Sequence, residues 1–415
     1  GILNLNIIER SSGVTVPARI EVLGSDGEGY VAEDALLTGG DCSVDKDSQF
    51  YHLDNIQSRK TKSLKNRFTR TTQFYSTGLS TVELPQGIAT IKVFKGPEYR
   101  VSQSDINIVA GKTTKHTITL TRLANMQAKG WYSADDHLHI SRPARILDPL
   151  ISKIMQAEDI HVANLLQIGK SDYFASSPQY AHGKNGIYKE GIYILSPGQE
   201  NPRTHLLGHT ITLGAEQALH NPEEYLLYKL LWKEAADMGA INGYAHFGNA
   251  LGASFGLPVV LPHGLMSFVE VLQANWSDYS TWYEMLNLGF RITPTAGTDY
   301  PCVTNLPGHE RFYTRVEDPF TYNNWLEGVR NGRTFVTTGP LLEFSVNGKD
   351  IGDDVKLNKP GTVIVEGKAT FNPQTDNLLG LEIMENGELV KSFSATDDSG
   401  VINFKFEHRV EKNSW

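Results

Sequence analysis

Alternation of apolar and polar residues predicts strands at both ends of the chain. Near the start these segments are residues 3–8, 18–23, 81–84, 89–94 and 115–121. After Gly339 the same pattern returns in residues 342–346, 362–366, 381–384, 389–393 and 401–406. Asn386-Gly387 lies between two of these later segments and predicts a two-residue type I′ hairpin. The pattern therefore predicts a β unit at each end of the chain.

The middle of the chain alternates short apolar segments with amphipathic ones. Asp148-Pro149, Asn221-Pro222 and Asp318-Pro319 each combine a helix-capping side chain with a proline suited to the first helical turn, and Gly239 should end the second helix. Such alternation favours a parallel β/α arrangement. We therefore expect a multidomain protein with a β-sandwich at residues 1–125, a β/α unit at residues 126–338 and a C-terminal β-sandwich at residues 339–415.

Composition excludes two classes of partner. The 415 residues carry 38 Lys and Arg against 47 Asp and Glu, and no dense basic run marks a nucleic-acid interface. No apolar stretch reaches the about 18 residues that a membrane-spanning helix needs. A basic segment at residues 57–70 is interpreted as a solvated loop or long hairpin rather than a contact with an anionic surface.

Two cysteines, Cys42 and Cys302, are too few for a disulfide framework or a zinc–thiolate site. We interpret Cys302 as a buried thiol and expect no disulfide between the two, since it would have to join two different units. The chain begins in a strand without an initiator methionine, as a processed or trimmed protein would. Together with the β-sandwich units, this start leads us to expect a location outside the cytoplasm.

Histidines are concentrated in the central unit, where ten of the 13 lie between His137 and His309. On a strand, His137 and His139 would point to the same side, and imidazole is a common metal ligand. Glu200, His246 and Asp299 each follow an apolar segment. Because functional groups of parallel β/α folds collect beyond the carboxyl ends of strands, these residues predict one metal site.

These residues, with His209, resemble the ordered motifs of the PHP (polymerase and histidinol phosphatase) superfamily, and within it those of the CehA/McbA-like metallohydrolases. Residues 333–342 and 346–348 are similar to the segment that leads into the C-terminal β domain of that branch. The resemblance covers about residues 130–353 and implies a distorted β/α barrel. The first β unit separately resembles a carboxypeptidase regulatory-like or transthyretin-like sandwich.

The resemblance implies two ligand sets that share one carboxylate. One ion would be held by His137, His139, Glu200 and Asp299, and a second by Glu200, His209 and His246. His205 is an alternative to His209, which we prefer because it leads into a strand. Three-metal relatives carry further ligands where this chain has Arg145, the stretch Leu166–Gly169 and Pro301. We therefore expect one or two divalent ions, with zinc as first choice and manganese or iron as alternatives.

The predicted reaction is hydrolysis of a small-molecule ester, carbamate, amide or phosphoester by metal-activated water, with Glu200 between the ions. Lys170 and Tyr300 are candidate proton donors, and Arg142 and Arg145 are candidate substrate-binding residues, by their position beside the motifs. For each of these four side chains, a surface or packing role is the more common interpretation.

Two rival hypotheses remain from the sequence. Residues 252–256 match the G-x-S-x-G pattern of serine hydrolases, with Ser254 as nucleophile, although Pro258 and Pro262 should block the helix which that motif needs. A secreted binding or scaffold protein with a partly degenerate metal site is the non-catalytic alternative. Glu270 is open to two interpretations, as a carboxylate that contacts a metal ligand or as an inward-facing strand residue. The other histidines of the segment are interpreted as core, loop or cap residues: His161, His182, His220, His263 and His309.

Overall fold

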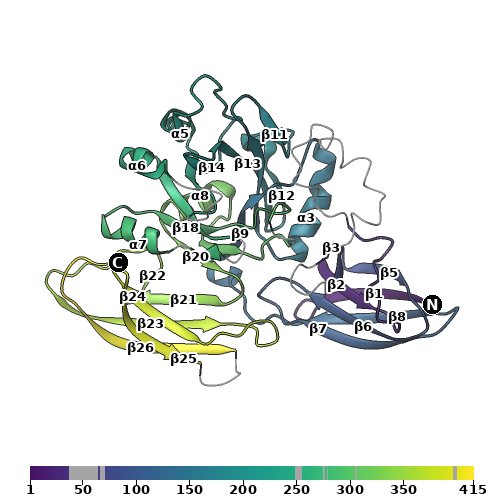
Figure 1. Cartoon of the computed structure of the whole chain (residues 1–415). Coiled ribbons are helices and arrows are strands. Elements are labelled where there is room, and N and C mark those ends of the chain that lie inside the picture. The colour runs from purple at the N-terminus through teal and green to yellow at the C-terminus, as the bar shows by residue number, and fades with distance from the viewer. Residues whose placement is uncertain are drawn as a thin grey trace.

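The computed structural model describes residues 1–36, 64–65, 71–247, 255–273, 276–277, 279–303, 306–395 and 400–415. The described chain is mostly β-sheet, and Figure 1 shows an N-terminal set of sheets in purple and a C-terminal set in yellow below the central part. This arrangement matches the predicted order of β, mixed and β units. The boundaries at residues 125/126 and 338/339 stay predictions.

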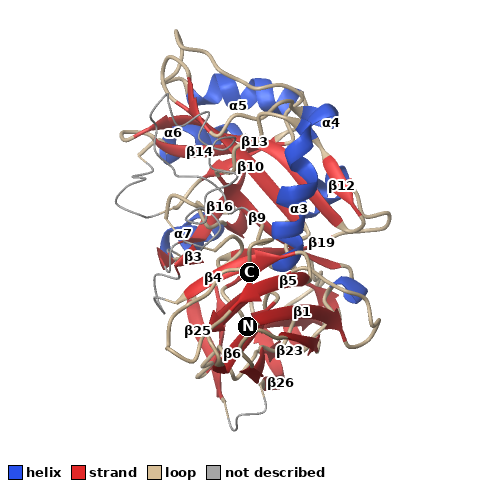
Figure 2. Cartoon of the chain, turned by 90° about the vertical axis from the view of Figure 1, so that its right-hand side faces the viewer, coloured by secondary structure: helices blue, strands red, loops and turns tan. Residues whose placement is uncertain are grey.

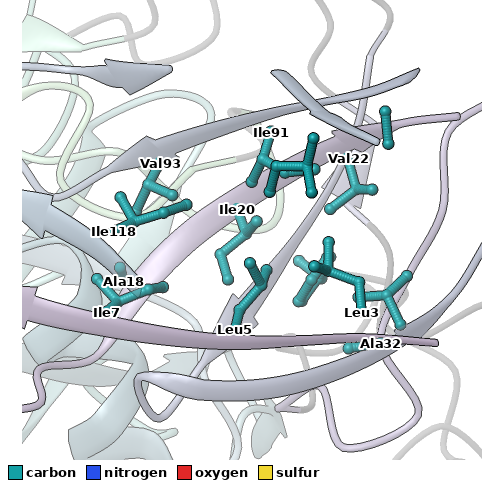
Figure 3. Packing of buried hydrophobic residues seen from close by; sticks show 14 of the residues in the cluster. Leu3, Leu5, Ile7, Ala18, Ile20, Val22, Ala32, Ile91, Val93 and Ile118 are labelled. Atoms are coloured by element: carbon teal, nitrogen blue, oxygen red, sulfur yellow. The ribbon is translucent and has the colours of Figure 1, made fainter. Parts of the chain in front are cut away.

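Two sheets pack face to face in the N-terminal part. Their strands are β1 (Ile2–Glu9), β2 (Ala18–Leu23), β3 (Leu64–Lys65), β4 (Thr72–Ser76), β5 (Leu79–Glu83), β6 (Gly87–Phe94), β7 (Ser102–Ile108) and β8 (Thr113–Leu120). One sheet has the order β5-β1-β8 and the other β3-β4-β2-β6-β7. Alternate residues of β1 point into the core between them, where they meet Ile20 and Val93 (Figure 3). Burying each such side chain contributes about 1.5–3 kcal/mol, so this face specifies the register.

The central part is built on one long sheet. Its strands are β9 (Trp131–Leu138), β10 (Val162–Gly169), β11 (Phe174–Ser176), β12 (Tyr188–Glu190), β13 (Tyr193–Thr204), β14 (Gly208–Leu213), β15 (Ile241–Tyr244), β16 (Met266–Gln273), β17 (Trp276–Ser277), β18 (Thr293–Ala296), β19 (Arg311–Arg315) and β20 (Thr334–Thr337). The main order is β17-β16-β15-β14-β13-β10-β9-β19-β20, with β18 beside β16. The Thr334 hydroxyl of β20 donates to the Pro294 carbonyl of β18 at 2.8 Å, so the sheet curves into a nearly closed barrel.

This sheet is mixed, whereas the sequence predicted parallel strands. The pairs β9–β10, β10–β13, β15–β16 and β16–β18 are parallel, as expected. The pairs β13–β14, β14–β15, β9–β19 and β19–β20 are antiparallel. A short hairpin joins β13 to β14, whereas β14–β15 and β19–β20 are joined through α5 and α8, and β9 pairs with the distant β19. The presence of a connecting helix therefore does not by itself make a strand pair parallel.

The helices of the central part are few and short: η3 (Gln127–Lys129), η4 (Arg145–Leu147), α3 (Asp148–Ala157), α4 (Gly183–Gly186), α5 (Tyr228–Asp237), α6 (Leu257–Val260), η6 (Leu261–His263), α7 (Ser280–Asn287) and α8 (Tyr322–Arg330). In Figure 2 α3 runs beside the central sheet, above the N-terminal strands. Among the described residues, no helix is both long and apolar enough to cross a membrane.

Two predicted helix starts were wrong. The Asn221 side chain does contact Glu224, accepting from its backbone N–H at 3.3 Å, but these residues form a turn, and α5 begins at Tyr228. Likewise α8 begins at Tyr322 rather than at Asp318, because Thr321 caps it by accepting from the Asn324 N–H. A capping side chain stabilises an isolated turn as well as a helix, so the local signal placed the turn correctly and the helix too early.

The third predicted start, at Asp148, has the right position and the wrong cause. Helix α3 does begin at Asp148, but this side chain makes no capping hydrogen bond. It accepts instead from Arg142 Nη1 at 3.2 Å and from the Tyr180 hydroxyl at 2.8 Å. The predicted helix end near Gly239 is confirmed, because α5 stops at Asp237 and Gly239 has a φ of 83°.

Six strands form the C-terminal part: β21 (Leu341–Val346), β22 (Lys349–Asp350), β23 (Gly361–Thr370), β24 (Gly380–Glu385), β25 (Glu388–Ser394) and β26 (Val401–Val410). A sheet of order β22-β21-β23-β26 packs against the β24-β25 hairpin through Val365, Phe404 and Phe393. Asn386 and Gly387 link this hairpin with φ values of 53° and 85°. The predicted type I′ turn is thereby confirmed, since both of its central residues need positive φ.

Candidate metal centre

Six predicted ligands come together at one edge of the central sheet. They lie in or just after strands β9, β13, β14, β15 and β18, and they are His137, His139, Glu200, His209, His246 and Asp299. Every one of them is largely buried: the side chains of five are at most 9% exposed, and that of Asp299 is 14% exposed. The sheet thus gathers imidazoles and carboxylates from strands that are distant in sequence.

The first cluster combines His137, His139, Glu200 and Asp299. The Nε2 atoms of His137 and His139 lie 3.1 Å apart. Asp299 Oδ1 lies 3.1 Å from His139 Nε2 and 3.6 Å from His137 Nε2. Glu200 Oε2 is 3.5 Å from His139 Nε2, so all four side chains face one point.

The second cluster consists of His209, His246 and the other carboxylate oxygen of Glu200. Its Oε1 lies 2.8 Å from His209 Nδ1 and 3.6 Å from His246 Nε2, and these two nitrogens are 3.1 Å apart. The ligand atoms of His137, His139 and Glu200 lie within 4.8 Å of one another, and so do those of Glu200, His209 and His246. Glu200 therefore stands between two groups of nitrogen donors, one on each carboxylate oxygen.

Hydrogen bonds to the far ring nitrogens prepare the two β9 histidines for a cation. His139 Nδ1 lies 3.1 Å from the Leu166 carbonyl oxygen, and His137 Nδ1 lies 3.0 Å from Glu270 Oε1. A nitrogen that faces an acceptor carries the proton, which leaves each Nε2 with a lone pair. Two lone pairs 3.1 Å apart in a buried site repel unless a cation lies between them. The donor set therefore fits a divalent ion of the kind that binds imidazole and carboxylate.

The electrostatics of the centre follow from burial opposed by neighbouring charge. Burial raises the pKa of Glu200, but Arg203 and His209 outweigh it, and the pKa lies well below its usual value. Burial lowers the pKa of His137, but the Glu270 and Asp299 carboxylates outweigh it and raise the pKa. Positive charge is thus favoured at this ring, and a divalent ion on Nε2 would supply it in place of a second proton. Glu200 is accordingly ionised and able to act as a ligand.

Glu270 contacts the ligands rather than only filling a strand. It is fully buried, and besides its contact with His137 it accepts the backbone N–H of His246 at 2.5 Å. Gly297 permits this packing, because a Cβ there would lie 2.6 Å from Glu270 Oε1 and 2.7 Å from Asp136 Oδ1. Of the two interpretations left open by the sequence, the geometry favours a carboxylate that orients a ligand.

Two ligands have strained backbones. His246 and Asp299 follow the ends of β15 and β18 with φ values of 32° and 52°. Positive φ is costly for a residue with a Cβ and persists where the surrounding structure holds it, often at functional sites. The chain thus turns sharply at both strand ends to direct these side chains inward.

The four candidate proton donors and substrate-binding residues have other side-chain surroundings in the structure. Arg142 is buried, and its guanidinium donates to Asp148 and to the Gly186 carbonyl, so it acts as a structural cation. Tyr300 is 2% exposed and packs in an apolar cluster that includes residues of α3. Lys170 lies 3.4 Å from the Tyr173 hydroxyl, and Arg145 is exposed on η4. Tyr300 also contacts the ligand His139, whose backbone N–H donates to the Tyr300 carbonyl at 2.7 Å. The roles of these four residues stay predictions.

Other histidines occupy the places that the sequence suggested for them. His161 is fully buried, and its Nδ1 accepts the backbone N–H of Ser133. His182 lies 3.4 Å from Gln167 Oε1, and His263 is exposed in η6. His205 is exposed and its ring centroid lies 6.2 Å from that of His209, so the geometry favours His209 over His205 as a ligand.

Cys302 corrects another prediction. It lies three residues after Asp299, and it is disulfide-bonded rather than a free thiol. A disulfide sulfur does not supply the thiolate that metal binding requires. Cys302 is therefore not a ligand in this state, although it lies close to His139 and Asp299. Cys42 lies outside the described residues.

The serine motif is only partly described. Ser254 lies outside the described residues, as does the basic segment apart from Leu64–Lys65. After the motif, α6 contains Pro258 within its first turn, so the prolines permit a helix of four residues. That helix is shorter than the one which follows a nucleophile elbow.

Sequence reasoning missed one charged neighbour of the ligands. Arg203 Nε lies 3.0 Å from Glu200 Oε2. The available signal was a basic residue three positions after a predicted ligand. That spacing points away from the ligand on a regular strand, which is why it carried no prediction.

Comparisons with known proteins add little. No protein-family model and no curated protein matches the chain. Among solved structures, it is similar to a two-domain protein from Bacteroides vulgatus ATCC 8482 described as containing a predicted PHP-like metal-dependent phosphoesterase, at 10% identity and a TM-score of 0.38, over 67% of this chain and 85% of the other. It is also similar to a streptococcal ancillary pilin, at 10% identity and a TM-score of 0.17, over 33% and 35% of the two chains. These TM-scores are too low for either likeness to support an argument.

Proposed function

We propose that the chain is a metal-dependent hydrolase of the PHP superfamily, in its CehA/McbA-like branch. The observation that carries this proposal is the pair of buried ligand clusters on the two oxygens of Glu200. His137, His139 and Asp299 would complete one ion site, and His209 and His246 the other. The resemblance in sequence motifs supports the same superfamily.

Divalent ions at such a site polarise the scissile group of a substrate and lower the pKa of water towards 7. The residues of this chain supply the rest. Glu270 holds the ring of His137 in place, and the buried sheet edge excludes bulk water around the ligands. An ester, carbamate, amide or phosphoester is the substrate class, and zinc, manganese or iron the ion.

A location outside the cytoplasm is part of the proposal. Disulfides persist in oxidising compartments and are rare in the reducing cytoplasm of mesophiles. The disulfide at Cys302 therefore supports a periplasmic or secreted protein.

The test joins metal analysis to a substrate panel. The full chain, loaded with zinc, manganese or iron, is assayed on chromogenic carboxylic esters, carbamates, phosphomonoesters and phosphodiesters. We expect turnover in one class, and in His137→Ala we expect loss of turnover together with loss of the ion held by the first cluster. His263→Ala is the matched control, since it removes an exposed histidine outside the clusters.

Two outcomes would favour the rival hypotheses. Substoichiometric metal after purification without chelators, together with no turnover, would favour a binding or scaffold protein. Turnover that survives metal removal and is abolished by a serine-directed covalent inhibitor would instead favour Ser254.

A further inference from the structure

A positive side chain reaches from solvent to the shared carboxylate of the metal centre. Arg203 Nε lies 3.0 Å from Glu200 Oε2, the oxygen that belongs to the first cluster. The Glu200 side chain is 2% exposed, whereas that of Arg203 is 30% exposed. The Arg203 side chain is therefore partly accessible to solvent beside a buried carboxylate.

The backbone is shaped to bring Arg203 to this position. On a regular strand, residues three apart point to opposite faces of the sheet. Between Glu200 and Arg203, however, the pairing of β13 with β14 shifts register, and such irregularities re-aim side chains. The Tyr225 hydroxyl then holds the segment by accepting the backbone N–H of Arg203 at 3.0 Å. The contact between the two side chains is thus built into the hairpin.

The Arg203 guanidinium has more hydrogen-bond donors than its contact with Glu200 uses. It carries five N–H donors and is always charged in proteins. Its Nε is buried beside Glu200 without a well-oriented hydrogen bond, and among the described residues no other acidic side chain pairs with Arg203. When Glu200 acts as a metal ligand, its oxygens are occupied, and the guanidinium is left to bind another anionic oxygen.

We propose that Arg203 binds an anionic oxygen of the substrate beside the metal centre and so selects substrates that are negatively charged at the reacting group. A phosphoester meets this requirement, and a neutral carboxylic ester or carbamate does not. The inference rests on the proposed hydrolase function. Arginine suits the task because its planar fork matches two oxygens at once.

The experiment compares Arg203→Met with Arg203→Lys in the full, metal-loaded chain. Arg409→Met is the matched control, since it removes the same charge from a side chain that is 60% exposed in β26. Inorganic phosphate binding is measured by calorimetry, metal content by elemental analysis, and KM on a phosphomonoester and a carboxylic ester of the same chromophore.

We expect Arg203→Met to weaken phosphate binding and raise the phosphomonoester KM by about 10- to 100-fold, as loss of hydrogen bonds to a charged group would. Metal content and the KM of the neutral ester should stay within about twofold. Arg203→Lys, which keeps the charge without the fork, should give an intermediate loss.

Three results would overturn the inference: no phosphate binding by the wild type, equal binding by wild type and both variants, or loss of metal in Arg203→Met as large as the loss of phosphate binding. The last would show that Arg203 only positions Glu200. If the wild type binds phosphate through Arg203 but hydrolyses nothing, the proposed function fails while the anion site stands.

Discussion

Replacing Glu270 by glutamine tests whether a buried carboxylate orients the metal ligands. Both oxygens of Glu270 face His137 Nδ1, at 3.0 and 3.1 Å, and Oε2 also accepts the His246 N–H at 2.5 Å. Glutamine keeps the shape but offers one acceptor oxygen. The amide NH2 then takes the place of one carboxylate oxygen beside His137 and His246, and the negative charge beside His137 is lost.

The size of the effect follows from this burial. Loss of a partner that orients a metal ligand costs about 10- to 100-fold in metal affinity. Because Glu270 is fully buried and water does not replace the lost acceptor, we expect the upper end, about 100-fold or 2.7 kcal/mol.

Chelator competition on the full chain measures this affinity. Glu343→Gln makes the same chemical change at a side chain that is 37% exposed in β21, and it should leave the affinity unchanged. An affinity for Glu270→Gln within about twofold of the wild type, in a folded variant, would refute the argument.

Three further predictions concern other parts of the central unit. His137→Ala should remove the ion of its own cluster and leave the one at His209, so that metal per chain falls by one ion; loss of both ions would contradict separate sites. Burial lowers the pKa of His161 to about 4, so stability is complete above pH 6.5 and falls as pH drops towards 4, by on the order of 3 kcal/mol. In His161→Gln the free energy of unfolding, measured with denaturant, should change less between pH 6.5 and 4 than in the wild type. An equal pH dependence in both proteins would contradict the prediction. Arg142→Met should destabilise by about 3–5 kcal/mol, because Asp148 stays buried without its cation, whereas an unchanged unfolding midpoint with a raised KM would favour substrate binding.

Local sequence determined those features whose physics is local. Side chains of a strand alternate between faces, so the pattern of residues 3–8 and 18–23 predicted β1 and β2 closely. The same period of two put His137 and His139 on one side of β9. Two residues with positive φ demanded the turn at Asn386-Gly387.

The sequence also predicted that the candidate ligands lie close together. Glu200, His246 and Asp299 lie in or just after apolar strands, and neighbouring strand ends in one sheet bring such residues together. The structure brings them to one centre around His137 and His139 even though the sheet is mixed. Whether they bind metal stays a proposal for experiment.

Only the tertiary structure determined the contacts of side chains that have several possible partners. Asp148 is suited to cap its helix, but its side chain accepts a hydrogen bond from the buried Arg142 instead. Tyr300 lies beside Asp299 in sequence, yet its ring packs in the core. Arg203 should have pointed away from Glu200, and a register shift between two strands turned it back. Strand pairing, register and disulfide bonds depend on residues far apart in the chain, so only the folded sheet determined which groups face the centre.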